Sequence, residues 1–222
     1  QGSSDGLAAD AGTAPLFMIN TGTIIGQSGF GIYANWQLSS TGTATLNNSG
    51  TIIGNSGSYT AFNGTGMNII NNAGLMVGTI YLDDGNDRYE GGAGRVVGRV
   101  YGDQDNDSLS GGAFYDELDG GSGNDLLVVG MGGGDMQGGI GIDTASFGPN
   151  QTGELSDGSP DWQPTQTSGQ AAIHLKDGIG GFRDLSTGVA HTYTFGGIEN
   201  VSGSLSDDRL TGDHARNQLS GD

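Results

Sequence analysis

The chain has 222 residues, enough for one domain or one elongated repeat structure, and it contains 46 glycines but only four prolines. This composition argues against ordinary helical packing and favours β structure with many turns. A net charge of −18, from 25 acidic and seven basic residues, argues against nucleic acid and anionic membranes as partners. The absence of cysteine excludes disulfides and thiolate metal sites, and no apolar run reaches the ~18 residues of a membrane span.

Residues 1–17 are small and polar, and we expect a poorly ordered lead-in there. Residues 18–101 contain a recurring short strand flanked by glycines, often with asparagine just before it. The copies start at Gly22, Gly50, Gly74 and Gly94, so their spacing falls from 28 to 24 to 20 residues. This pattern predicts the rungs of a right-handed parallel β-helix, with a side loop around Trp36 in the longest rung.

A second repeat, nine residues long, runs through residues 82–146. Its copies read LDDGNDRYE, GGAGRVVGR, GDQDNDSLS, GGAFYDELD, GGSGNDLLV, VGMGGGDMQ and GGIGIDTAS, with Val100 and Tyr101 between the second and third. Glycines at the first, second and fourth positions permit a tight turn, and the last three residues form a short strand with one inward side chain. The predicted inward residues are Tyr89, Leu109, Leu118, Leu127, Met136 and Ala145.

Two nonapeptides complete one coil, so each turn lies over the turn two repeats later, about 4.8 Å away. The sixth-position carboxylates on one edge then form a column of Asp87, Asp107, Asp125 and Asp143. Carboxylates about 5 Å apart repel by roughly 3 kcal/mol at an effective dielectric near 20, so the column resists folding unless it is neutralised. A hard cation that prefers oxygen ligands, such as Ca²⁺, is the expected occupant. The opposite edge aligns Val96, Asp116 and Gly134, where only Asp116 is a candidate ligand.

The nonapeptide resembles the calcium-binding repeat of the RTX (repeats-in-toxin) family of secreted bacterial proteins, and residues 120–128 and 138–146 match it at every position. The resemblance implies a parallel β-roll in which each ion lies between stacked turns, held by two aspartates and by turn carbonyls. It implies three sites, namely Asp87/Asp107, Asp107/Asp125 and Asp125/Asp143. The implied turn residues are Gly121, Gly123, Gly139 and Gly141. Asp83, Asp84, Asp103 and Asp105 replace glycines, and they either add ligands or are solvated.

The two repeats overlap, because residues 78–89 and 98–109 align at an offset of 20. We therefore expect one all-β solenoid, in which a β-helix over residues 18–101 continues into an RTX β-roll over residues 82–147. The charge changes abruptly at this junction. Residues 1–82 contain only Asp5 and Asp10, whereas residues 83–143 contain thirteen acids and three arginines.

After Phe147 the period breaks, and residues 148–202 are predicted to form an insertion. It comprises a long loop over residues 148–168 and a small β layer with strands at 171–175, 189–195 and 198–201. Residues 203–222 resemble resumed RTX repeats, with Asp208 and Asn217 at the sixth positions, and Asp208 is a further candidate calcium ligand. The sequence begins at Gln1 and stops within a repeat at Asp222, so we expect both ends to be cut or processed.

Other motifs give weak support for chemistry. The Gly-x-Ser-x-Gly at residues 2–6 lacks the strand and helix that flank a hydrolase nucleophile. The three histidines, His174, His191 and His214, are scattered and do not form a zinc motif. Residues 18–82 contain no acidic residue, which argues against a polysaccharide-processing β-helix.

We therefore expect a non-enzymatic, calcium-loaded β-solenoid that is secreted by a bacterium and acts at the cell surface or in a matrix as a structural or adhesive element. The resemblance implies type I secretion. We call residues 11–82, which carry no charged side chain, the uncharged half, and residues 83–147 the acidic half. Open coil ends and the uncharged half predict self-association into a fibre or lattice. A cell surface or polysaccharide is a further candidate partner. The alternative is the calcium-binding tail of a larger secreted protease, lipase or polysaccharide epimerase, which a catalytic sequence before Gln1 would favour.

Overall fold

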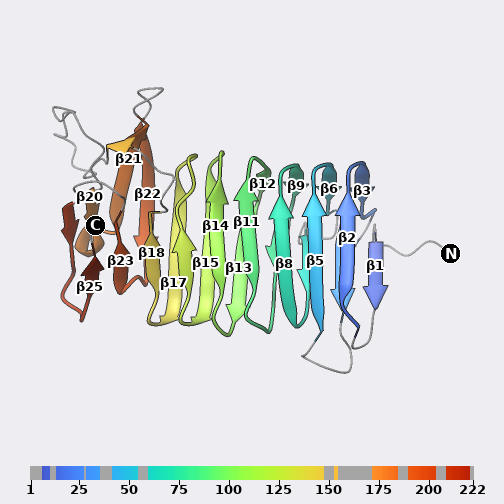
Figure 1. Ribbon diagram of the computed structural model, residues 1–222, viewed down its shortest axis with the longest axis horizontal. Helices are drawn as coiled ribbons and strands as arrows, with labels where there is room; N and C mark the ends of the chain where they lie inside the picture. The colour runs from blue at the N-terminus through green and yellow to red at the C-terminus, as the bar shows by residue number, and fades with distance from the viewer. Residues whose placement is uncertain are drawn as a thin grey trace.

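The computed structural model describes residues 7–10, 14–27, 29–35, 42–54, 60–147, 153–154, 172–184, 190–203 and 209–220. Over these residues the chain winds into successive coils that stack along one long axis (Figure 1). Strands of consecutive coils pair in parallel, so most hydrogen bonds of the sheets join one coil to the next. The predicted all-β solenoid is confirmed.

Three sheets form the sides of the coils. Sheet A contains β1 (Leu7–Asp10), β4 (Ile32–Asn35), β7 (Thr60–Gly64), β10 (Thr79–Tyr81), β13 (Arg99–Gln104), β15 (Asp116–Gly123), β17 (Gly134–Gly141), β22 (Ala190–Gly196), β21 (Ile179–Asp184), β20 (Ala172–His174) and β24 (Arg209–Thr211), in that order, with β19 (Gly153–Glu154) beside β21. Sheet B contains β2 (Leu16–Asn20), β5 (Thr43–Asn48), β8 (Met67–Asn72), β11 (Arg88–Gly92), β14 (Ser108–Gly112), β16 (Leu126–Val128), β18 (Thr144–Ser146), β23 (Asn200–Ser202) and β25 (Gln218–Ser220). Sheet C contains β3 (Thr23–Ile25), β6 (Thr51–Ile53), β9 (Leu75–Val77) and β12 (Arg95–Val97).

Sheet C divides the solenoid into two kinds of coil. The strands that the recurring glycine motif predicted are the four strands of sheet C, paired in the predicted register. After β12 no described strand joins sheet C, and the coils have only the two sides formed by sheets A and B. The loss of the third side explains why the repeat shortens to 18 residues, as in the pairing of Leu109 with Leu127. The β-helix therefore continues into the β-roll without a break.

The core is a set of inward columns, one for each sheet. Every predicted inward residue of the nonapeptides is fully buried, and each pairs with its equivalent one coil away. The column of sheet A contains Ile32, Phe62, Ile80, Val100, Leu118, Met136 and Phe195, and the column of sheet B contains Met18, Leu46, Ile70, Tyr89, Leu109, Leu127, Ala145 and Val201. Because equivalent side chains of consecutive coils stack on one another, few gaps are left between the coils. Each buried aliphatic side chain contributes about 1.5–3 kcal/mol to the free energy of folding.

Two segments differ from the sequence-based expectations. Within the predicted lead-in, Leu7–Asp10 forms β1 and pairs with β4, so this part belongs to the first coil. The predicted small β layer is also wrong in part, because β22 stacks on β17 and β23 stacks on β18. Phe195 and Val201 supply the inward side chains of this coil, so the solenoid resumes near residue 190 rather than at residue 203.

The insertion contributes a hairpin that lies within sheet A. Strand β21 pairs antiparallel with both β22 and β20, and β20 pairs parallel with β24 of the last described coil. A short 3-10 helix, η1 (Leu175–Asp177), connects β20 to β21. At this end of the molecule the strands of the insertion and of the last coils lie side by side (Figure 1). The predicted loop over 148–168, apart from β19, and the side loop at Trp36 lie outside the described residues.

Candidate cation site

The four aspartates of the predicted column occupy equivalent places in consecutive coils. Each lies immediately before a strand of sheet B, and each is at most 3% exposed. The strands pair in register, so Asp87, Asp107, Asp125 and Asp143 stack directly over one another. We call this set the aspartate ladder. The structure therefore contains the column of four aspartates that the sequence predicted.

Backbone amides fix one oxygen of each carboxylate. Asp107 Oδ1 accepts a hydrogen bond from the amide of Asp87 at 2.8 Å, and Asp125 Oδ1 accepts one from Asp107 at 2.8 Å. Asp143 Oδ1 accepts in the same way from Asp125 at 2.9 Å, and Asp87 Oδ1 accepts from the amide of Asn68 at 2.5 Å. Each side chain therefore reaches back to the preceding coil, which holds the ladder in a fixed orientation.

The second oxygen of each carboxylate has no such partner. The Oδ2 atoms of Asp87, Asp107, Asp125 and Asp143 are all buried and accept no hydrogen bond from any described residue. Leaving a buried acceptor unpaired costs about 1–3 kcal/mol, and more if the group is charged. Four equivalent unpaired oxygens in one column fit a cation bound at each coil.

The surroundings of the ladder disfavour negative charge. Burial, and to a smaller extent the next carboxylate in the column, raises the pKa of Asp87 to about 9 and that of Asp107 to about 8, against the lowering effect of the backbone amides. Burial also raises the pKa of Asp125, and it raises that of Asp143 to about 6. Without a cation Asp87 and Asp107 therefore retain protons near neutral pH, and a bound cation would stabilise the ionised carboxylates instead.

Glycines give the ladder its space. A Cβ on Gly102, Gly120 or Gly138 would overlap the unpaired Oδ2 of Asp107, Asp125 or Asp143, respectively. Carbonyl oxygens of the following coil, those of Gly120, Gly138 and Gly197, border the same three spaces. Carboxylate and carbonyl oxygens thus converge at each coil, and these are the ligands that Ca²⁺ prefers.

The predicted turn glycines serve the same purpose. Gly121, Gly123, Gly139 and Gly141 all have positive φ, between 102° and 152°, and a Cβ on any of them would overlap a carbonyl of the preceding coil. Asp105, also at positive φ, is exposed, and its carbonyl oxygen is the group that lies against Gly123. Among the described residues no three His, Cys, Asp or Glu side chains gather to hold a metal ion. A cation here would therefore need the backbone carbonyls as well as the aspartates.

Asp116 lies on the other edge, outside the ladder. It is buried, and its Oδ2 accepts a hydrogen bond from the amide of Gly112 at 2.6 Å. Burial raises its pKa to about 6. The prediction that Val96 precedes it in the stack is wrong, because Val96 belongs to β12 in sheet C, and the register of β13 with β15 places Gly98 beside Asp116. With glycines on both sides, Asp116 has no second carboxylate to share a cation with. Asp208 lies outside the described residues.

Sequence reasoning missed the residues at the two ends of the ladder. Glu199 lies just before β23, and its Oε2 accepts a hydrogen bond from the amide of Asp143 at 2.9 Å, as an aspartate of the ladder would. Asn68 takes the corresponding place before Asp87. Residues 196–202 read GGIENVS, which is the nonapeptide GGIGIDTAS shortened by two residues, so a search that allowed deletions could have found Glu199. Asn68 carries no such signal.

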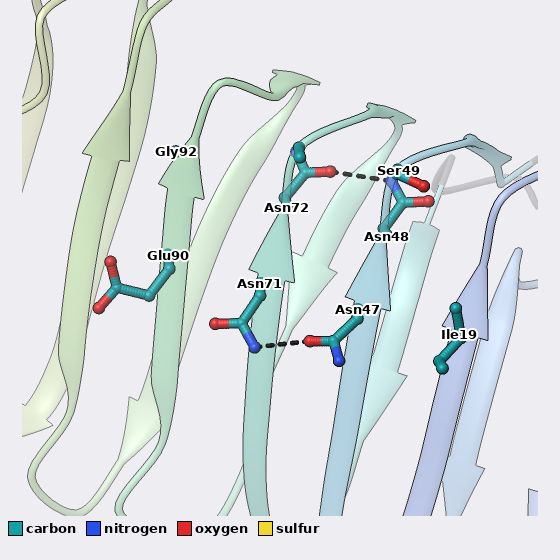
Figure 2. A pocket seen from close by; sticks show the side chains of 9 residues that line it. Ile19, Asn47, Asn48, Ser49, Asn71, Asn72, Glu90 and Gly92 are labelled. Atoms are coloured by element: carbon teal, nitrogen blue, oxygen red, sulfur yellow. Dashed lines mark hydrogen bonds between the residues drawn. The ribbon is translucent and has the colours of Figure 1, made fainter.

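A second surface feature lies mainly in the uncharged half and reaches Glu90 of the acidic half. A groove of about 300 Å³ crosses the outward face of sheet B and is lined by Ile19, Asn47, Asn48, Ser49, Asn71, Asn72, Ala73, Glu90 and Gly92. Figure 2 shows Ile19, Asn47, Asn71 and Glu90 on neighbouring strands, with Asn71 donating to Asn47 Oδ1 at 2.7 Å. Phe17 and Ile19 are 63% and 67% exposed on this face. No catalytic pair of acids lines the groove.

Comparison with known families identifies the repeat. The family model of the RTX calcium-binding nonapeptide repeat matches four copies, over residues 79–96, 101–136 and 193–222. The last of these ranges includes the coil of Phe195, Glu199 and Val201, which agrees with the resumption of the solenoid before residue 203. No curated protein matches the chain. None of the described residues forms a helix long and apolar enough to cross a membrane.

Proposed function

We propose that this chain, a β-solenoid with calcium-binding RTX repeats, is a structural or adhesive element that works outside a bacterial cell, and that it is not an enzyme. The observation that carries the proposal is the continuity of the stack. The uncharged coils pair directly with the coils of the aspartate ladder, so that calcium bound in one half would hold a rigid, uncharged surface in the other. An RTX tail that only assists an enzyme has no need of such a surface.

Calcium would bind between consecutive coils of the ladder. The unpaired Oδ2 atoms of Asp107 and Asp125 each border a carbonyl of the following coil, and Asp87 takes the equivalent place one coil earlier, so three positions lie between aspartates, as expected from the resemblance. The unpaired Oδ2 of Asp143 adds a fourth, which the carbonyl of Gly197 borders, and Glu199 of the next coil accepts from the amide of Asp143. A divalent cation at each position would supply the positive charge that the carboxylates lack and would remove the repulsion between neighbours.

The uncharged half supports self-association. No Asp, Glu, Lys or Arg occurs from residue 11 to residue 82, so no charge keeps two copies apart there. The exposed Phe17 and Ile19 and the groove beside them give this face apolar surface to bury. Calcium would neutralise the acidic half of each copy, which would remove the remaining long-range repulsion. Side-by-side association of solenoids through sheet B is therefore our favoured route to a fibre or lattice.

Sedimentation of the full chain with and without millimolar calcium tests the assembly. We expect larger species in calcium, and we expect Ile19→Lys to abolish them because it places a charge in the exposed apolar part of the face. Ile140→Lys is the matched control, because Ile140 is 78% exposed but lies in the acidic half. A monodisperse monomer in millimolar calcium, or equal effects of the two substitutions, would contradict assembly through this face.

The alternative proposal is a calcium-binding tail of a larger secreted enzyme, because RTX repeats also occur in such tails. The complete reading frame separates the two proposals. A protease, lipase or epimerase sequence joined to this chain would favour the tail, whereas further β-solenoid or repeat sequence would favour the structural element. A cell surface or polysaccharide remains our candidate partner for the exposed face in either case.

A further inference from the structure

The aspartate ladder ends at Asn68, which no repeat pattern predicts. Ile69 pairs with Arg88, so Asn68 lies in β8 directly before Asp87 in the stack. The residue is fully buried, with no exposed side-chain surface. It therefore holds the ladder position of the coil that joins the uncharged half to the acidic half.

The side-chain amide of Asn68 points at oxygens. Asn68 Nδ2 donates a hydrogen bond to the carbonyl of Gly66 at 2.6 Å and to that of Leu82 at 2.8 Å, and it lies 3.4 Å from Asp87 Oδ1. An N–H₂ group surrounded by three oxygens has the surroundings that the cation would have in the following coils. Its two protons satisfy the carbonyls without any ion.

The same geometry recurs in the ladder with an aspartate in place of the asparagine. Leu82, Gly102, Gly120 and Gly138 follow one another in the stack of sheet A. The side chain of Asn68 borders the space of a Cβ on Gly64, just as Asp107 Oδ2 borders that of Gly102, and the next carbonyl is that of Leu82 in one case and Gly120 in the other. In the ladder two acceptors, the carboxylate and the carbonyl, face each other and need a proton or a cation between them, whereas at Asn68 the amide supplies an N–H of its own.

We propose that Asn68 terminates the cation column, because its amide nitrogen takes the place of the first ion. The first cation then lies between Asp87 and Asp107, and the uncharged half needs none. Asn68 Oδ1 stays buried and unpaired, but it is a neutral carbonyl oxygen, which costs far less to bury than a carboxylate. This inference rests on calcium binding by the ladder, as proposed above, and it assigns Asn68 a positioning role at the junction.

The substitution Asn68→Asp tests this inference. It removes the two N–H donors and adds a carboxylate, so it should convert the end of the column into one more calcium site. We expect one additional Ca²⁺ per chain relative to the unchanged protein, measured by native mass spectrometry and titration calorimetry of the full chain. We also expect the melting temperature of the variant to depend more steeply on calcium concentration.

Two further variants separate a positioning role from a merely structural one. Asn68→Ala should lower the melting temperature but leave the number of bound ions unchanged, because Asn68 holds none. Asn48→Asp is the matched control, since Asn48 is also a buried asparagine of sheet B but bonds to other asparagines. It should add no ion.

The outcomes divide cleanly. Loss of an ion in Asn68→Ala would make Asn68 a ligand and overturn the inference, as would an unchanged ion count, or a failure to fold in millimolar calcium, in Asn68→Asp. In those cases the unchanged protein still binds calcium, and the proposed function stands. An unchanged protein that binds no calcium would overturn the proposed function and this inference together.

Discussion

The two halves of the solenoid solve one problem in two ways. Each must bury a column of polar side chains at the ends of its sheet B strands. In the uncharged half the column consists of asparagines, and Asn20 donates to Asn48, and Asn48 to Asn72, at 2.8 Å each. In the acidic half it consists of aspartates. An amide carries both donors and acceptors, so each asparagine bonds to the next and only Asn72 Nδ2, at the end of the stack, has no partner among the described residues, whereas a carboxylate carries acceptors alone and needs a cation from solution.

This difference makes one half self-sufficient and the other conditional. The apolar columns run through both halves, so the core alone does not distinguish them. The two halves are distinguished by the unpaired carboxylate oxygens, which occur at all four aspartates of the ladder. The halves should therefore respond differently to calcium, to substitution and to pH, and each of these responses tests the comparison.

Removal of calcium should have the largest effect. With excess chelator we expect residues 83–147 to lose most of their β structure, because binding and folding of the roll are one event. The coils from β2 to β9 should stay folded. Hydrogen exchange resolved by peptide measures the two halves separately. Equal protection of both halves in chelator, or equal loss, would break the comparison.

Substitution in the middle of the ladder should come next. Asp125→Ala removes a carboxylate that would contact two cations, so in calcium we expect a loss of about 3–5 kcal/mol of unfolding free energy. Asp116→Ala is the control, since this equally buried residue loses only one hydrogen bond and should cost about 1 kcal/mol. Chemical unfolding in calcium and in chelator compares them, and only Asp125→Ala should flatten the dependence on calcium.

The acidic half should also show an inverted dependence on pH when calcium is absent. Burial raises the pKa of Asp87 and Asp107 from 3.8 to about 9 and about 8, so the folded roll binds these protons more tightly than the unfolded chain. The stability from this source is fully present below about pH 4 and is lost as the pH rises through 8 to 9. The β structure that the roll keeps in chelator, measured by circular dichroism, should therefore decrease from pH 5 to pH 9. A rise over that range would contradict the raised pKa values.

The smallest effect should come from the asparagine column. Asn48→Ala removes side-chain bonds to Asn20 and Asn72 and should cost about 2 kcal/mol, with no dependence on calcium. Asn47→Ala is its control, because Asn47 accepts an exposed bond from Asn71 and should cost less than about 1 kcal/mol. A loss that disappears on adding calcium would show that the two columns are not independent.

The sequence predicted the ladder because glycine spacing reports backbone conformation directly. Gly121, Gly123, Gly139 and Gly141 adopt the positive φ that their motif requires, and this fixes where Asp125 and Asp143 lie. The same pattern misplaced Val96, because the coil of residues 91–98 keeps a third side that a nine-residue count does not include. Here the nonapeptide and the β-helix rung compete for the same residues, and the pairing of β12 with β9 prevails.

The residues at the two ends of the ladder, Asn68 and Glu199, could not be predicted from the nine-residue sequence pattern, because their roles depend on which residues stack on them. Asn68 resembles any other strand asparagine, and only its register with Asp87 reveals its place. Glu199 follows a turn shortened by two residues, yet Phe195 and Val201 still fill the apolar columns and carry the coil onto the roll. Inward packing, more than the glycine motif, decided where the solenoid resumed.

The hairpin of β20 and β21 has a geometric consequence. In sheet B the last two described strands, β23 and β25, are direct neighbours, so that side advances by one strand spacing of about 4.8 Å. In sheet A, β24 is separated from β22 by β21 and β20, so that side advances by three spacings, roughly 14 Å. The last coil therefore forms a wedge, and the axis of winding must turn toward sheet B at this point. A wedge cannot lie flat against the parallel face of another solenoid, and any further coil would grow in a new direction.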